Sequence, residues 1–135
     1  MIAALVDYLA MFYQTGNMAQ MEVVARSMLA AIPDDIVALQ FLGLALYQMG
    51  YVDRARQMFK RVADKHVLLT AESDSTLCES ASVVSYREAT RAHSGLADGW
   101  YRIAMALNRF GFHKPATRAF EAALTAGGAK GATSV

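Results

Sequence analysis

Hydrophobic residues recur along the chain at the three- and four-residue spacing of amphipathic α-helices. Such stretches end at Gly16, Gly50 and Gly111, and a new amphipathic stretch follows each glycine. Because residues three and four apart share one face of a helix, the pattern predicts pairs of helices, each joined at a glycine. Glycine suits these turns because the chain there must adopt a backbone conformation that other residues resist. The predicted unit is therefore helix, glycine turn, helix.

The unit repeats with a period of 34 residues. Gly16 and Gly50 are 34 residues apart, and a third copy begins near Ala97. Three hydrophobic columns of the first helix stay in register through the copies: Leu5, Leu39 and Trp100; Tyr8, Leu42 and Ile103; Phe12, Leu46 and Leu107. The repeat units are residues 2–35, 36–69 and 97–130. Units of this kind bury their apolar faces on their neighbours, so they predict a stacked array.

The columns carry the residues of a known helical repeat. The third copy has the most complete set: Trp100, Ile103, Ala104, Leu107, Gly111, Ala116, Phe120, Ala123 and Leu124. The second copy has Leu42, Gly43, Leu46, Gly50, Ala55, Phe59 and Val62, and the first matches less closely but keeps the phase and Pro33. The pattern resembles the tetratricopeptide repeat family. This resemblance implies an all-α fold, a right-handed solenoid of helical hairpins within a single domain, residues 1–126.

An insertion separates the second and third copies. Gly50 and Gly111 are 61 residues apart, which is 27 more than one period and leaves residues 70–96 outside the repeats. After a polar stretch at 72–76, which suits a helix start, hydrophobic residues at helical spacing suggest an amphipathic helix: Leu77, Ala81, Val84, Tyr86 and Ala89. Two interpretations stay open, a shortened degenerate repeat and a flexible insert carrying one helix. In both, we expect an extra helix before the third copy.

Composition and charge narrow the classes of function. The chain of 135 residues is 55% hydrophobic, and its mean hydropathy of +0.22 is high for a small domain. The excess predicts a partner or a dimer. A net charge of +1 gives no bulk attraction to nucleic acid or to an anionic membrane. The charge is uneven, because residues 1–35 are acidic and residues 85–135 are basic, and this predicts an acidic end and a basic end.

The two termini carry no sequence signal for a membrane or for export. The apolar run from Met1 to Tyr13 is interrupted by Asp7 and is too short to span a bilayer. It also lacks the basic start and the cleavage site of a signal peptide, so we expect a cytoplasmic protein. Cys78 is the only cysteine and cannot form an internal disulfide. The small-residue tail, residues 127–135, is predicted to be disordered.

No set of residues predicts catalysis. The histidines His66, His93 and His113 lie on different segments, and none has a metal-ligand spacing with Cys78 or an acidic residue. The glycines near the end are not followed by a helix, as a phosphate-binding loop would require. We therefore expect no enzyme, no metal site, no cofactor and no small-molecule substrate.

The family resemblance implies a binding groove. In tetratricopeptide repeats, certain columns of the first helices line a concave groove that receives an extended peptide or a helix. Carried onto this chain, those columns hold Val6, Ala10, Tyr13, Val37, Phe41, Leu44, Tyr47, Tyr101, Arg102, Met105, Asn108 and Arg109. We expect Phe41 and Leu44 to point away from the core, so that glutamate at both would leave the helices intact. Arg102 and Arg109 are expected to pair with a carboxylate of the ligand.

These features predict a protein–protein interaction scaffold or adaptor that binds a hydrophobic peptide or helix. One alternative is a holdase chaperone, because the size and the apolar groove resemble those of small secretion chaperones. Another alternative is a structural homodimer. A further possibility is that the protein occupies its own groove. The inserted helix, or the same face of a second copy in a symmetric dimer, would then fill it.

Overall fold

The computed structural model describes residues 2–64, 86, 89–90 and 94–134, and every regular element within them is a helix. The described part of the chain is therefore all-α, as predicted. The elements, in chain order, are α1 (Ile2–Thr15), α2 (Met18–Ala31), α3 (Ile36–Gln48), α4 (Val52–Asp64), the 3-10 turn η1 (Ser94–Leu96), α7 (Ala97–Arg109) and α8 (His113–Ser134).

The helices pair as three hairpins with the same glycine turn. Gly16, Gly50 and Gly111 have φ angles of 77°, 93° and 89°, which confirms the predicted turn conformation. In each turn the residue after the glycine donates its backbone N–H to a carbonyl five residues earlier. The bonds are Asn17 to Phe12 (2.9 Å), Tyr51 to Leu46 (2.8 Å) and Phe112 to Leu107 (2.9 Å). This bond satisfies a carbonyl that the helix end leaves free. The first helix of each hairpin therefore ends with the same capping hydrogen bond.

The link between the first and second hairpins is held by two aspartates. Asp35 caps α3, because its Oδ2 accepts a hydrogen bond of 3.0 Å from the backbone N–H of Ala38. Asp34 has a φ of 61°, a left-handed conformation that aspartate tolerates better than most residues. Its side chain forms an ion pair with Arg61 of α4. The loop is thereby fixed to the second hairpin.

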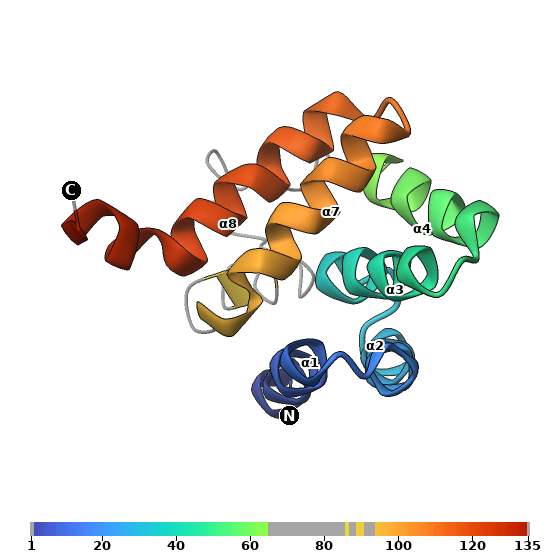
Figure 1. Cartoon of the computed structure of the whole chain (residues 1–135). Helices are drawn as coiled ribbons and strands as arrows, with labels where there is room; N and C mark the ends of the chain where they lie inside the picture. The colour runs from blue at the N-terminus through green and yellow to red at the C-terminus, as the bar shows by residue number, and fades with distance from the viewer. Residues whose placement is uncertain (1, 65–85, 87–88, 91–93, 135) are drawn as a thin grey trace, which may run out of the picture.

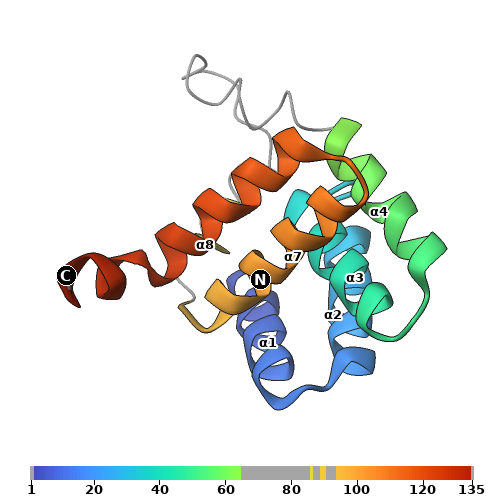
Figure 2. The same cartoon turned by 45° about the horizontal axis from the view of Figure 1, so that its top comes forward.

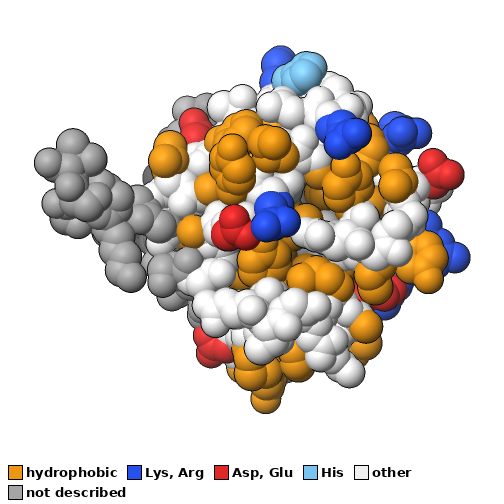
Figure 3. Space-filling model, viewed as in Figure 1, with side chains coloured by type: hydrophobic (Ala, Val, Ile, Leu, Met, Phe, Trp, Pro, Cys, Tyr) orange, Lys and Arg blue, Asp and Glu red, His pale blue; other side chains and the backbone are white. Residues whose placement is uncertain are grey.

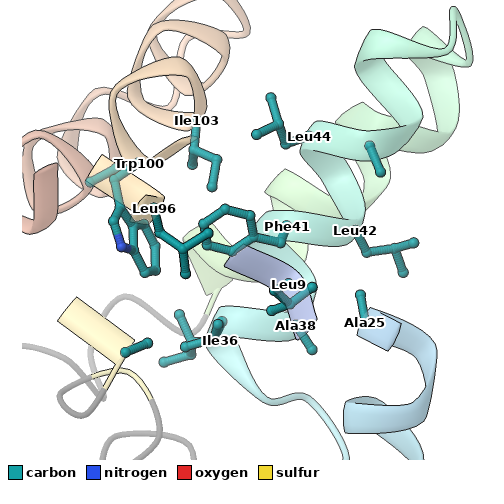
Figure 4. Packing of buried hydrophobic residues seen from close by; sticks show 14 of the residues in the cluster. Leu9, Ala25, Ile36, Ala38, Phe41, Leu42, Leu44, Leu96, Trp100 and Ile103 are labelled. Atoms are coloured by element: carbon teal, nitrogen blue, oxygen red, sulfur yellow. The ribbon is translucent and has the colours of Figure 1, made fainter. Parts of the chain in front are cut away.

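Helix α3 is the centre of the molecule. It contacts α2 and α4 on its two sides and α7 across another face, an arrangement visible in Figures 1 and 2. All eleven residues from Ile36 to Leu46 are buried. The Trp100 ring of α7 packs edge-on against Phe41, with ring centroids 4.8 Å apart, and against Tyr86 at 5.3 Å. Figure 4 shows Trp100, Phe41 and Ile103 meeting in this core.

The described end of the insertion packs on the third hairpin. Tyr86, Ala89 and Thr90 are buried, and the Tyr86 hydroxyl donates a hydrogen bond of 3.0 Å to the backbone carbonyl of Arg118 in α8. Tyr86 and Ala89 therefore occupy core positions, as their spacing suggested. The other residues of the predicted inserted helix lie outside the described residues, as do His66, Cys78 and His93.

The end of α8 differs from the sequence prediction. The tail was expected to be disordered from Gly127, whereas α8 continues to Ser134. Ala129 and Ala132 favour a helix here and no proline interrupts the segment, whereas Gly127, Gly128 and Gly131 disfavour it. Figure 1 shows the end of α8 extending away from the other helices.

Candidate functional site

An open groove lies between α3 and α7, and we call it the α3–α7 groove. It has a volume of about 570 Å3 and is lined by Leu44, Tyr47, Gln48, Asp98, Tyr101, Arg102, Met105, Ala106 and Arg109. In Figure 3, hydrophobic side chains gather around α7 with charged groups among them. The groove is large enough for several side chains of a ligand.

The apolar lining is held in place by aromatic contacts. Tyr101 and Met105 lie four residues apart on one face of α7 and are 50% and 53% exposed. The Tyr101 ring packs edge-on against Phe120 at 5.6 Å, and the Tyr47 ring packs edge-on against Phe110 at 5.7 Å. Rings held in this way lose little conformational entropy when a ligand covers them.

A charged cluster links α1 to the start of α7. The Tyr13 hydroxyl donates a hydrogen bond of 2.5 Å to Asp98 Oδ2, and Arg102 Nε donates to the same oxygen at 2.9 Å. Burial of the phenol, reinforced by the hydrogen bond to Asp98, raises the pKa of Tyr13 well above its usual value. The hydrogen bonds from Tyr13 and then from Arg102 lower the pKa of Asp98. Arg102 is thus already paired within the chain.

A second cavity, of about 540 Å3, adjoins the groove beyond this cluster. It is lined by Tyr13, Gln14, Gly16, Met18, Gln48, Gly95, Asp98 and Arg102. Gln48, Asp98 and Arg102 line both cavities. The concave surface therefore runs from the α1–α2 turn to the end of α7, with the Tyr13–Asp98–Arg102 cluster across its middle.

The far end of the groove is cationic. Arg109 is exposed on the last turn of α7 and makes no ion pair with any residue that the structure describes. Nearby, the Arg56 guanidinium lies 5.0 Å from the centroid of the Phe110 ring. A carboxylate of a ligand would meet Arg109 before Arg102, because Asp98 already neutralises Arg102.

No protein-family model matches this chain, and neither does any curated protein. The likeness to tetratricopeptide repeats therefore rests on the hydrophobic columns and the glycine turns. Within residues 2–64 and 94–134, no helix is long and apolar enough to cross a membrane. The described residues also bring no three histidine, cysteine or acidic side chains together as a metal site.

Half of the predicted groove residues line the α3–α7 groove: Leu44, Tyr47, Tyr101, Arg102, Met105 and Arg109. Tyr13 lines the second cavity. Asn108 is exposed at the end of α7, where its Oδ1 lies 2.9 Å from Nδ1 of His113. Ala10 is half-buried against the core.

The remaining predicted groove residues, Val6, Val37 and Phe41, are buried. The expectation that Phe41 and Leu44 point away from the core is wrong, because both belong to the hydrophobic core and only the edge of Leu44 reaches the groove. Helix α7 packs directly on this side of α3, and Gly99 leaves room for the Phe41 ring. The side of α3 that was predicted to be groove is largely a contact between hairpins.

The second cavity was not expected from the sequence, because its wall includes Gly95 of the insertion. The Asp98–Arg102 pair was foreseeable, since oppositely charged residues four apart on a helix often pair. Its partner Tyr13, 85 residues away, had no local signal.

Removing the Tyr13 hydroxyl tests this cluster through the pH dependence of stability. Below pH about 10, the unfolded and folded states both keep the Tyr13 proton. Above it, only the folded state does, because its pKa is raised, so this contribution to stability is lost as pH rises. The Asp98 contribution is lost as pH falls below about 4, because the pKa of that carboxyl is lowered in the folded state.

We therefore expect Tyr13→Phe to lower the free energy of unfolding by about 1 kcal/mol at neutral pH. The difference from wild type should shrink above pH about 10 and below pH about 4. Urea unfolding across this range measures it. Tyr51→Phe, at an exposed tyrosine outside the cluster, is the control. A difference in the free energy of unfolding between wild type and Tyr13→Phe that stays constant with pH would show that the hydrogen bond does not shift the pKa of Tyr13 or of Asp98.

Proposed function

We propose that the chain is a protein–protein interaction adaptor, built as a right-handed solenoid of tetratricopeptide-like hairpins, that binds an apolar peptide or helix in the α3–α7 groove. The repeated glycine turns and their shared hydrogen bond support the solenoid. The buried columns, in which Trp100, Leu107 and Phe59 lie at the predicted positions, support the same register. The insertion interrupts the array between its second and third hairpins.

The observation that carries the proposal is the apolar surface of the groove. Tyr101 and Met105 are half exposed beside Tyr47, so the surface of the groove is apolar at positions that solvent reaches. Covering the exposed halves of two such side chains contributes about 2 kcal/mol. Arg109 at one end adds a preference for an acidic group. The ligand that fits is a short apolar segment with one carboxylate near its end.

Truncating Tyr101 is the direct test. Peptides are selected from a random library on the wild-type protein, and their affinities are measured by fluorescence anisotropy. We expect Tyr101→Ala to weaken binding roughly tenfold or more, because a buried aromatic side chain dominates such contacts. Tyr51→Ala is the matched control, since Tyr51 is 52% exposed but lies at the α3–α4 turn.

Arg109→Gln, measured in the same experiment, separates the contribution of the positive charge to peptide affinity from that of the apolar contact. It should weaken the selected peptides at low salt and have less effect at high salt, because salt screens an exposed pair. Equal losses for Tyr101→Ala and Tyr51→Ala, or none for either, would place the binding surface outside this groove.

A further inference from the structure

One face of α1 is exposed, although the corresponding faces of α3 and α7 are buried. In the repeat register, Leu5, Tyr8 and Met11 correspond to Leu39, Leu42 and Ala45 in α3 and to Trp100, Ile103 and Ala106 in α7. The six residues of α3 and α7 are all buried. Tyr8 and Met11 are 50% and 45% exposed, and Leu5 is only half-buried. We call Leu5, Tyr8 and Met11 the leading face.

The third hairpin leaves the opposite face open. Tyr101 and Met105 of α7 correspond to Gln40 and Leu44 of α3, and Leu124 of α8 corresponds to Ala63 of α4. Gln40 and Leu44 are buried. By contrast, Tyr101 and Met105 are half exposed, and Leu124 is the most exposed large hydrophobic residue among those described, at 71%. We call Tyr101, Met105 and Leu124 the trailing face.

The contact between α3 and α7 shows how these two kinds of face meet. There the Trp100 ring, from the column that corresponds to Leu5, packs at 4.8 Å on the Phe41 ring of α3. Ile103, from the column of Tyr8, points toward Phe41 and Leu44 (Figure 4). Leading-column residues of the third hairpin thus pack on Phe41 and on Leu44, and Leu44 is the counterpart of Met105. By contrast, Tyr8 and Met11 of the first hairpin and Tyr101, Met105 and Leu124 of the third stay exposed.

We propose that a second copy of this chain is the occupant: the leading face of one molecule packs on the trailing face of the next. The two ends also differ in charge: the first hairpin is acidic and the third is basic, so they attract each other. Helices α1 and α2 carry two acidic residues and one basic residue, whereas α7 and α8 carry five basic and two acidic residues. Arg109 lies one turn beyond Met105 on α7, at the basic end of the described chain.

This contact is heterologous, because two different surfaces meet. It leaves a free face at each end, so it forms open chains of copies rather than a closed symmetric dimer. The inference uses the repeat register of the proposed function, and the trailing face shares Tyr101 and Met105 with the α3–α7 groove, so a second copy and a peptide would compete for these two side chains. The variants that test it, at Met11 and Leu124, lie outside the α3–α7 groove, so its failure would leave peptide binding intact.

Sedimentation of the wild-type protein over a wide concentration range tests the association. We expect the average mass to rise above the monomer mass of 14.7 kDa. The association should weaken as salt increases, because the charge on the two ends is screened. Met11→Lys and Leu124→Gln should each remain monomeric. Tyr51→Lys, which changes an exposed apolar residue away from both faces, should associate like wild type.

Mixing the two variants distinguishes head-to-tail contact from symmetric pairing. Met11→Lys keeps an intact trailing face and Leu124→Gln keeps an intact leading face, so an equimolar mixture should form dimers and nothing larger. A wild type that stays monomeric would overturn the proposal. So would association that Leu124→Gln abolishes and Met11→Lys leaves unchanged, since this is the pattern of a symmetric contact through the trailing face alone. Circular dichroism of each variant confirms that it is folded.

Discussion

Replacing Phe41 with alanine is expected to lower the free energy of unfolding by about 3–5 kcal/mol, the usual cost of removing a buried phenylalanine. Phe41 is fully buried and packs edge-on against Trp100 of α7. It also fills the space left by Gly99, where a Cβ atom would lie 2.9 Å from Phe41 Cε1. Urea unfolding followed by circular dichroism measures the loss.

Met105→Ala is the matched control for that experiment, because Met105 lies on the groove side of α7 and is half exposed. It should cost less than about 1 kcal/mol. Phe41→Glu, which would leave the helices intact if Phe41 lined an open groove, should instead leave the protein largely unfolded, since a charge cannot be buried unpaired in this core. A stable, helical Phe41→Glu protein would contradict the packing of α7 on α3.

Replacing Gly43 with leucine is expected to disrupt the second hairpin. A Cβ at Gly43 would lie 3.0 Å from Cε1 and Cζ of Phe59 and 3.3 Å from Cβ of Met58, so larger groups have no space. Overpacking in a core costs about 1–3 kcal/mol and more when backbones must separate. Because α3 also contacts α2 and α7, we expect the midpoint of urea unfolding to fall sharply, with early amide exchange in α3 and α4.

Gly43→Ala is the control for this substitution. The alanine Cβ would be tight against the Phe59 ring and Met58 Cβ, which opposes the substitution, but alanine favours the helix by about 1 kcal/mol over glycine. Its net effect should therefore be small. A Gly43→Leu protein as stable as wild type would mean that the two helices do not touch at this column, and the repeat register would be wrong.

The helices and their turns could be predicted from the sequence because their signals are local. Each glycine turn needs a positive φ, and Gly16, Gly50 and Gly111 supply it at the ends of hydrophobic stretches. The close contact at Gly43 could also be predicted, because the third copy has the small residue Ala104 in the same column, although the first copy has Leu9 there. Such features depend on residues a few positions apart, which periodicity describes well.

The surface of the site could be predicted only in part. Whether Phe41 faces a groove or a neighbouring helix depends on where α7 packs, and α7 follows an insertion that no repeat pattern describes. The pairing of Tyr13 with Asp98 likewise joins residues 85 apart in sequence. Tyr101 and Met105 line the α3–α7 groove, because they lie on the last hairpin and no further helix of the described chain covers them.

The most direct test of the central claim, that the α3–α7 groove binds an apolar peptide, is a methyl NMR titration with methionine methyl labels. A peptide selected on the wild-type protein is added to dilute protein. Met105 reports on the groove, Met11 on the leading face, and the buried Met21 and Met28 on the core. We expect the Met105 signal to shift and the other three to stay. Binding that leaves Met105 unchanged, or that shifts Met21 and Met28 instead, would contradict the proposed site.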